Sequence, residues 1–300
     1  MRDRLHGSNT VRATRGVFLL FLIAVYTSFG PSSAYAQPKG RPTPNLQNLE
    51  QLDPEDGIRV LQQIRKVGLA GDFIFEFRLI HRPKTGDESN YSGTMIGTWN
   101  GALQTRTELY HNPASDKVFR LLQHNGPHPR IWKLDQDADE SIPTELKGIA
   151  LHQPFFDGIT FSPFELQMPF LYWNDFVYEG TKRVKGRPAH LFLLYPPESD
   201  GAYPLIGAVR AVIDADFNIV LRAEILDHAG NELKSLSVQS FKKVDEQWII
   251  RRVDLIDEQT KDRTRFEIFG AALGLDLPNN YFLPENLSAR IQLNQTLQFF

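Results

Sequence analysis

The sequence predicts a mainly β protein built on an antiparallel sheet, and three observations indicate this fold class. Several segments alternate apolar and polar residues, which is the period of strands with one buried and one solvated face. Turn signals such as Asn100-Gly101 and Asp245-Glu246 separate these segments. Strands and helices do not alternate regularly along the chain, and this disfavours a parallel sheet.

The N-terminus has the pattern of a secretory signal peptide. A start with four arginines precedes the apolar run Val17–Tyr26, and Ala34-Tyr35-Ala36 then places small residues at the two positions that a signal peptidase reads. As a helix, the apolar run would span about 15 Å, which is roughly half of a bilayer core. We therefore expect export to the periplasm, with cleavage after Ala36.

Composition limits the classes of partner. Removing residues 1–36 takes four arginines and one aspartate from totals of 33 basic and 36 acidic residues, which leaves a formal charge of −6. This acidic balance argues against a nucleic-acid partner. The chain has no cysteine, so burial must hold the fold without disulfides, and a chain of this length can bury a full core.

The first predicted element is an amphipathic helix. Residues 37–52 are rich in proline and polar residues and are expected to form a flexible leader. Asp53 can then cap a helix that has Pro54 in its first turn and ends near Gly68. Its predicted apolar stripe consists of Ile58, Leu61 and Ile64, with Val60 and Val67 beside it.

About ten strands are expected after the helix. In the first, Phe73, Phe75 and Phe77 share one side, and in residues 103–110 the charged pair Arg106 and Glu108 marks the face expected to be solvated. From Ala208 onward the segments follow one another at the hairpin spacing of a meander. The ten segments are residues 73–79, 91–99, 103–110, 118–123, 189–195, 208–214, 219–226, 233–241, 248–256 and 265–268.

One apolar stretch interrupts the strands. Residues Phe155–Trp173 carry many aromatic and large aliphatic side chains and little charge. Ser162 and Pro163 can begin a short helix, and Pro169 would interrupt it. Two interpretations remain open: the stretch fills one end of the sheet as ordinary core, or it is a lid over an apolar cavity that holds a ligand.

Residue patterns for catalysis or metal binding are weak. The sequence has neither a Gly-x-Ser-x-Gly motif nor a cysteine nucleophile. His124 and His128 are separated by Asn-Gly-Pro, which prevents them from sharing a helical face as a zinc pair would. The acidic run from Asp135 lacks the glycine and the final carboxylate of a calcium loop. We therefore predict no enzyme activity, no metal and no cofactor.

The order of these features resembles the outer-membrane lipoprotein-sorting family, the LolA-like proteins. The similarity covers about Asp53 to Asp276, although the chain is longer than these proteins and shows no match to the basic residue that tunes ligand release in the family. The matching stretches are Tyr178–Gly180, Val184–Pro197, Val212–Asp214, Ala223–Asp227 with Gly230, Leu233-Lys234, Gln247-Trp248 and Thr264.

This resemblance implies a fold and a task. The fold is a strongly curved antiparallel sheet, an unclosed half-barrel over residues 53–276, with a few covering helices and a C-terminal extension at 277–300. The task is to carry lipoproteins or other acylated amphiphiles through the periplasm, from an inner-membrane donor to an outer-membrane acceptor. The residues expected to line the apolar cavity and its lid are Phe73, Phe75, Phe77, Phe161, Phe164, Met168, Phe170 and Trp173.

Two other classes of protein remain alternatives. The final segment alternates and closes on Phe299-Phe300, as the last strand of an outer-membrane β-barrel often does, but such strands need a lipid-facing side that is free of charge. An extracytoplasmic enzyme acting on lipid or glycan is the other alternative, because 36 acidic residues offer many carboxylate pairs.

Overall fold

The computed structural model describes residues 41–42, 54–110, 118–135, 142–156, 158–184, 186–198, 201–292 and 294–300. The predicted signal peptide, its cleavage after Ala36, the helix cap Asp53 and most of the predicted leader lie outside these residues. The leader residues Arg41 and Pro42 are described, and the Tyr195 hydroxyl donates a hydrogen bond to the Pro42 carbonyl oxygen at 2.9 Å.

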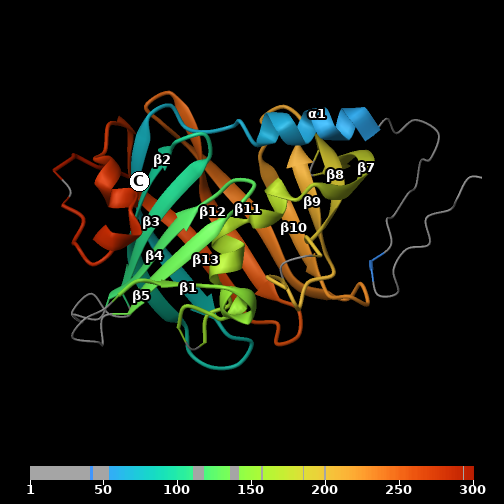
Figure 1. Ribbon diagram of the computed structural model, residues 1–300, viewed down its shortest axis with the longest axis horizontal. Helices are drawn as coiled ribbons and strands as arrows, with labels where there is room; N and C mark the ends of the chain where they lie inside the picture. The colour runs from blue at the N-terminus through green and yellow to red at the C-terminus, as the bar shows by residue number, and fades with distance from the viewer. Residues whose placement is uncertain are drawn as a thin grey trace, which may run out of the picture. The chain divides into compact units, whose positions relative to one another are not determined.

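Strands dominate the described part of the chain, and they form one antiparallel sheet that does not close (Figure 1). Its order is β6-β5-β4-β3-β2-β1-β13-β12-β11-β10-β9-β8-β7, and β14 pairs with β13 beside this path. The strands are β1 (Asp72–Arg82), β2 (Ser89–Trp99), β3 (Leu103–Tyr110), β4 (Val118–His124), β5 (Arg130–Asp135), β6 (Thr144–Glu145), β7 (Asp175–Val184), β8 (Arg187–Tyr195), β9 (Ala208–Asp214), β10 (Val220–Leu226), β11 (Glu232–Val244), β12 (Gln247–Asp257), β13 (Arg263–Leu275) and β14 (Gln298–Phe299).

The predicted fold class, a curved and unclosed antiparallel sheet with few helices, is confirmed. All ten predicted strands are present, and the meander from Ala208 becomes the consecutive neighbours β9 to β13. The additional strands are β5, β6, β7 and β14. Two of these, β6 and β7, are the edges of the sheet, where strands are often short or carry charge and therefore show a weak apolar alternation.

Two glycines allow the first two strands to pack closely. Phe73 and Phe77 of β1 pair with Gly97 and Gly93 of β2. A Cβ atom at Gly97 would lie 2.1 Å from the Phe73 ring, and one at Gly93 would lie 2.5 Å from the Phe77 ring. The absence of these side chains therefore gives the two rings their places on the inner face.

Helix α1 (Pro54–Ile64) lies across the ends of β7 to β10 (Figure 1). Val60, Leu61 and Ile64 are buried as expected, and Gly57 completes the stripe because it lies against the side chain of Tyr178. The prediction that Ile58 belongs to this stripe was wrong. Residues 57, 60, 61 and 64 follow the helical repeat of three and four, which turns Ile58 toward solvent with 47% exposure.

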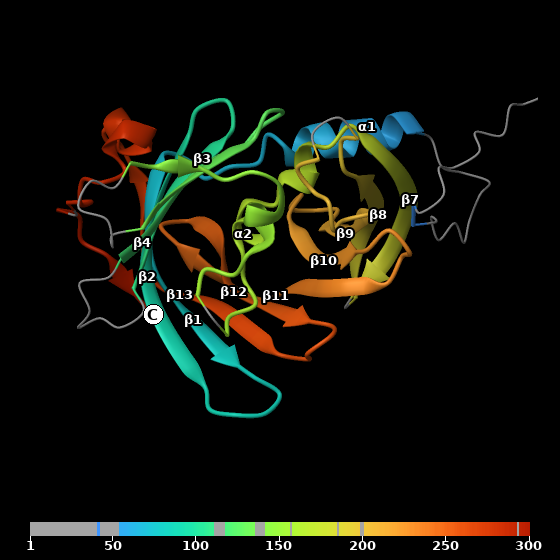
Figure 2. The ribbon, with the colours of Figure 1, turned by 60° about the horizontal axis from the view of Figure 1, so that its bottom comes forward.

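The segment between β6 and β7 occupies the hollow of the curved sheet (Figure 2). Its helices are η1 (Gly148–His152), α2 (Pro163–Gln167) and η2 (Pro169–Tyr172). The predicted short helix is confirmed: Ser162 is its N-cap, and the Glu165 carboxylate accepts from the Ser162 backbone N–H at 2.7 Å. Met168 then adopts a left-handed conformation (φ 51°), which ends α2 before Pro169.

Residues 277–292 lie against the outer face of β1 to β5. They contain η3 (Asn279–Phe282) and η4 (Pro284–Asn286), and Leu277, Phe282 and Leu287 pack in one buried cluster with Ile96 and Trp132. The prediction of a solvated face at Arg106 and Glu108 was therefore wrong. These residues are 0% and 4% exposed because the C-terminal segment covers them.

Candidate functional site

The eight residues predicted to line a cavity come together in one apolar cluster inside the curved sheet. Seven of them are at most 7% exposed, and Met168 is partly buried against the same cluster. The Phe73 and Phe75 rings stack at 4.4 Å, and the Phe77 ring stacks on Phe266 at 4.6 Å. In the 155–173 segment, Phe164, Phe170 and Trp173 contact one another at 6.1 to 6.4 Å between ring centroids.

The space between this segment and the sheet is filled by side chains. The opening among Phe77, Phe119, Phe161, Leu166 and Phe266 has a volume of only about 10 Å³. A ligand pocket usually measures about 300–1,000 Å³. In this conformation the inner face of the sheet is therefore a packed core, and an acyl chain could enter it only if the 155–173 segment moved.

Polar contacts fix the 155–173 segment at both of its ends. The Lys234 ammonium of β11 donates to the Thr160 carbonyl oxygen at 2.8 Å and lies 3.0 Å from the Glu165 carboxylate. The Arg65 guanidinium, just after α1, donates to the carbonyl oxygens of Leu171 and Trp173 at 2.8 and 2.9 Å. These charge-assisted bonds hold the segment against the sheet and leave its outer surface exposed to an open cleft.

That cleft has a volume of about 590 Å³ and lies between the two edges of the sheet. Arg130 of β5 and Glu145 of β6 line it from one edge, and Asp175 of β7 and Tyr195 of β8 line it from the other. Its floor is formed by α2 and η2, to which Gln167, Pro169 and Tyr172 belong, and by the following Trp173.

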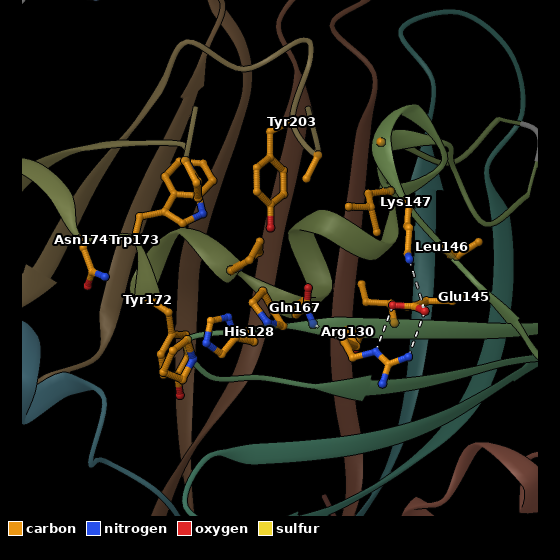
Figure 3. A pocket seen from close by; sticks show the side chains of 18 of the residues that line it. His128, Arg130, Glu145, Leu146, Lys147, Gln167, Tyr172, Trp173, Asn174 and Tyr203 are labelled. Carbon is orange, nitrogen blue, oxygen red and sulfur yellow. Dashed lines mark hydrogen bonds and ion pairs between the residues drawn. The ribbon is translucent and has the colours of Figure 1, made fainter. Parts of the chain in front are cut away.

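The two sides of the cleft differ in chemistry (Figure 3). Trp173 and Tyr172 stand opposite Arg130, Glu145 and Lys147. Trp173 contacts Tyr203 at 5.1 Å between ring centroids, so this side is aromatic. The indole Nε1 of Trp173 is buried and has no hydrogen-bond partner among the residues that the structure describes.

The opposite side of the cleft is charged and ordered by ion pairs. The Arg130 guanidinium donates to both oxygens of Glu145 at 2.9 Å, and Lys147 lies 3.5 Å from the same carboxylate. Hydrogen bonding from Arg130 lowers the pKa of Glu145, so this carboxylate is ionised at neutral pH. The cleft therefore offers an aromatic surface to an apolar group and a cationic rim to a polar group of the same ligand.

The sequence analysis identified only part of this cleft. Trp173 was predicted, whereas the charged rim at Arg130, Glu145 and Lys147 and the aromatic Tyr203 were missed. These residues come from separate segments that no spacing rule connects. The only local signal was the aromatic pair Tyr172-Trp173 at the end of the apolar stretch 155–173, since aromatic side chains outside a strand pattern often belong to binding surfaces.

Among the residues that the structure describes, no group of three or more histidines or carboxylates is arranged to hold a metal ion. Within the same residues, no helix is both long and apolar enough to cross a membrane.

Comparisons with known proteins define the family and the fold. Residues 107–289 match the model of a family described as an uncharacterized protein, and the chain belongs to this family. No curated protein matches the sequence at a significant level.

Several solved structures are similar to the chain in fold. A DUF1329 family protein from Desulfovibrio piger has a TM-score of 0.66 at 16% identity, covering 79% of this chain and 100% of its own. A putative outer membrane lipoprotein-sorting protein domain from Vibrio parahaemolyticus has a TM-score of 0.65 at 16% identity, covering 77% and 97%. A LolA superfamily protein from Nitrosomonas europaea has a TM-score of 0.56 at 14% identity, covering 78% and 98%. At these identities, the likeness establishes the LolA-like fold.

Proposed function

We propose that this protein is an exported periplasmic binding protein that carries a lipoprotein or another acylated amphiphile, and that it acts without catalysis and without a cofactor. The polar part of the ligand lies at the rim formed by Arg130, Glu145 and Lys147. The acyl part lies on Trp173 and Tyr203 and continues into the interior when the 155–173 segment moves away. A donor at the inner membrane and an acceptor at the outer membrane are the partners that this task requires.

The observation that carries the proposal is the position of the 155–173 segment between an open cleft and an aromatic core. Its outer surface is the floor of the 590 Å³ cleft, and its inner surface contacts the predicted cavity residues. Displacing this single segment would join the two spaces. The eight residues Phe73, Phe75, Phe77, Phe161, Phe164, Met168, Phe170 and Trp173 would then contact the acyl chain.

The energetics favour such a ligand. Each CH₂ group removed from water contributes about 0.8 kcal/mol, so a long acyl chain offsets part of the packing that the segment loses when it moves away from the core. The fold supports the proposal as well, because the Vibrio and Nitrosomonas proteins of similar fold are named for lipoprotein sorting and for the LolA superfamily.

The first test is native mass spectrometry of the exported protein, purified from the periplasmic fraction without detergent and followed by organic extraction and lipid analysis. We expect an amphiphile at near-equal stoichiometry, and its loss in the Trp173→Glu variant. The matched control is Trp99→Glu, because Trp99 packs on Gly68 and does not line the cleft. A protein that carries no amphiphile, or one that keeps it in the Trp173→Glu variant, contradicts the proposal.

A second test asks whether the segment must move. The Asn125 side chain donates to the Gln167 carbonyl oxygen at 3.3 Å, and the chain has no native cysteine, so the pair Asn125→Cys and Gln167→Cys introduces the only two thiols. We expect the oxidised protein to take up an added acylated probe at least about tenfold more weakly than the reduced protein, with the cross-link verified by mass. Equal uptake in both states would show that acyl binding does not need the segment to move.

A further inference from the structure

A second apolar hollow, of about 360 Å³, lies away from the cleft and shares no lining residue with it. Its apolar lining consists of Val67, Phe217, Ile219, Phe241, Trp248 and Ile250. Trp248 and Phe217 are 59% and 51% exposed, which is unusual for side chains of this size. An exposed apolar patch of this kind marks an interaction surface.

Three separate elements bring these side chains to one end of the sheet. Val67 follows α1, Phe217 is in the turn between β9 and β10, and Trp248 begins β12 directly after the β11–β12 turn. Arg187, at the start of β8, holds its guanidinium 4.9 Å from the Phe217 ring centroid and pairs with the buried Asp214. The aromatic side chains are therefore held in place by packing and ion pairing from neighbouring hairpins.

From the hollow, strand β12 runs toward a cluster of arginines on the same sheet. Arg252 lies four residues after Trp248 on β12, about 13 Å along an extended strand. Its carboxylate partner Glu267 also accepts two hydrogen bonds from Arg78. Further along β12, about 20 to 26 Å from Trp248, Asp254 accepts two hydrogen bonds from Arg265 and lies 3.8 Å from Arg263.

Arg251 also lies 4.0 Å from Glu267, so five arginines share two carboxylates in this cluster. The carboxylates of Glu267 and Asp254 are 4% and 6% exposed, whereas the arginine side chains are 25% to 48% exposed. The remaining guanidinium N–H groups face solvent, and their fork geometry matches the oxygens of a phosphate group. The patch is positive on a chain whose predicted mature form is acidic.

We propose that this end of the sheet docks on a membrane that contains anionic lipid. Trp248, Phe217 and Phe241 enter the boundary between headgroups and acyl chains, where aromatic residues are favoured. When β12 is inclined to the membrane, the offset between Trp248 and Arg252 places Arg252 and the neighbouring Arg78 at the phosphate layer. A second copy of the chain fits less well, because docking of two such faces would bring two positive clusters toward each other.

This inference goes beyond the proposed function, and it does not require that the cleft hold a ligand. It is tested by co-sedimentation of the exported protein with vesicles of phosphatidylethanolamine and phosphatidylglycerol, compared with vesicles of phosphatidylcholine alone. We expect binding to the anionic vesicles only, weakening as salt is raised. The variant Trp248→Ser/Phe217→Ser should lower this binding at least about tenfold.

Two further variants separate the contribution of the arginines from that of the aromatic side chains and provide a control. Arg252→Gln removes the charge about 13 Å from Trp248 and leaves Glu267 paired with Arg78, and it should weaken binding about fivefold at low salt. Leu283→Ser is the matched control, since Leu283 is 42% exposed on the C-terminal segment, and it should leave binding unchanged. Absence of vesicle binding, or equal binding by the double variant, overturns the proposal. Self-association that the double variant abolishes without any vesicle binding would overturn it and assign the face to a second copy.

Discussion

The outer face of the sheet carries two Arg–Glu–Arg groups that differ in their access to water. In the first, Glu108 of β3 lies 2.9 Å from Arg106 and 3.0 Å from Arg120, and both arginine side chains are at most 1% exposed. In the second, Glu267 of β13 joins Arg78 and Arg252, whose side chains are 48% and 35% exposed.

The difference comes from residues 277–292, which cover the first group and leave the second open. Arg106 donates to the carbonyl oxygens of Asn286, Leu287 and Ala289 of that segment. The same residue types therefore anchor a chain segment at one place and present positive charge to solvent at the other. The comparison teaches that burial under the C-terminal segment, and not the local sequence, decides how much these ion pairs contribute to the free energy of unfolding.

The largest expected effect tests this comparison directly. Glu108→Gln leaves two buried arginines without their carboxylate and should lower the free energy of unfolding by about 3–5 kcal/mol. Glu267→Gln is the matched variant, because its arginines can turn to water, and it should cost about 1 kcal/mol. Urea denaturation of both variants measures the two losses of stability. Equal losses would contradict the conclusion that burial under the C-terminal segment makes the Glu108 group the more important one.

A smaller effect is expected from loosening the cover itself. Leu287 is fully buried between the C-terminal segment and the outer face, so Leu287→Ala should cost about 2–4 kcal/mol by leaving a cavity. Leu283→Ala on the same segment should cost less than about 0.5 kcal/mol, since that side chain is 42% exposed. If thermal unfolding gives the same midpoint for both variants, the segment does not stabilise the sheet in the way described.

The smallest expected effect is a pH dependence of stability that comes from His124, which lies against the C-terminal segment. Burial lowers the pKa of His124. The hydrogen bond that its Nε2–H group donates to the Phe282 carbonyl oxygen, at 2.9 Å, raises the pKa but is the smaller effect. Below the unfolded pKa of about 6.5 the unfolded chain binds more protons, so stability falls with acidification by at most about 1.4 kcal/mol per pH unit for this group.

His124→Gln should reduce that slope without removing it, because burial also lowers the pKa of His81, His152 and His190. Urea denaturation at pH 5, 6 and 7 measures the slope for the wild type and the variant. Identical slopes would mean that His124 does not titrate differently in the folded and unfolded chains.

Much of the fold could be predicted, because its signals are local. Alternation located ten strands, and Ser162-Pro163 located the start of α2. The edge strand β7 was missed because most of its residues are partly or fully exposed, which leaves little alternation to detect. The cleft could not be assembled in advance, because Arg130, Glu145, Trp173 and Tyr203 meet only after the sheet has curved.

By itself, the sequence determined where ten of the fourteen described strands lie, that Phe73, Phe75 and Phe77 share a side, and that residues 155–173 pack on that side, because each depends on residue period or local apolar content. Tertiary structure alone decided which polar faces are buried and where the cleft lies. Arg106 is buried by a segment 180 residues further along the chain, and no local pattern encodes such a contact. The physical reason is that burial depends on distant parts of the chain, whereas periodicity depends on neighbours.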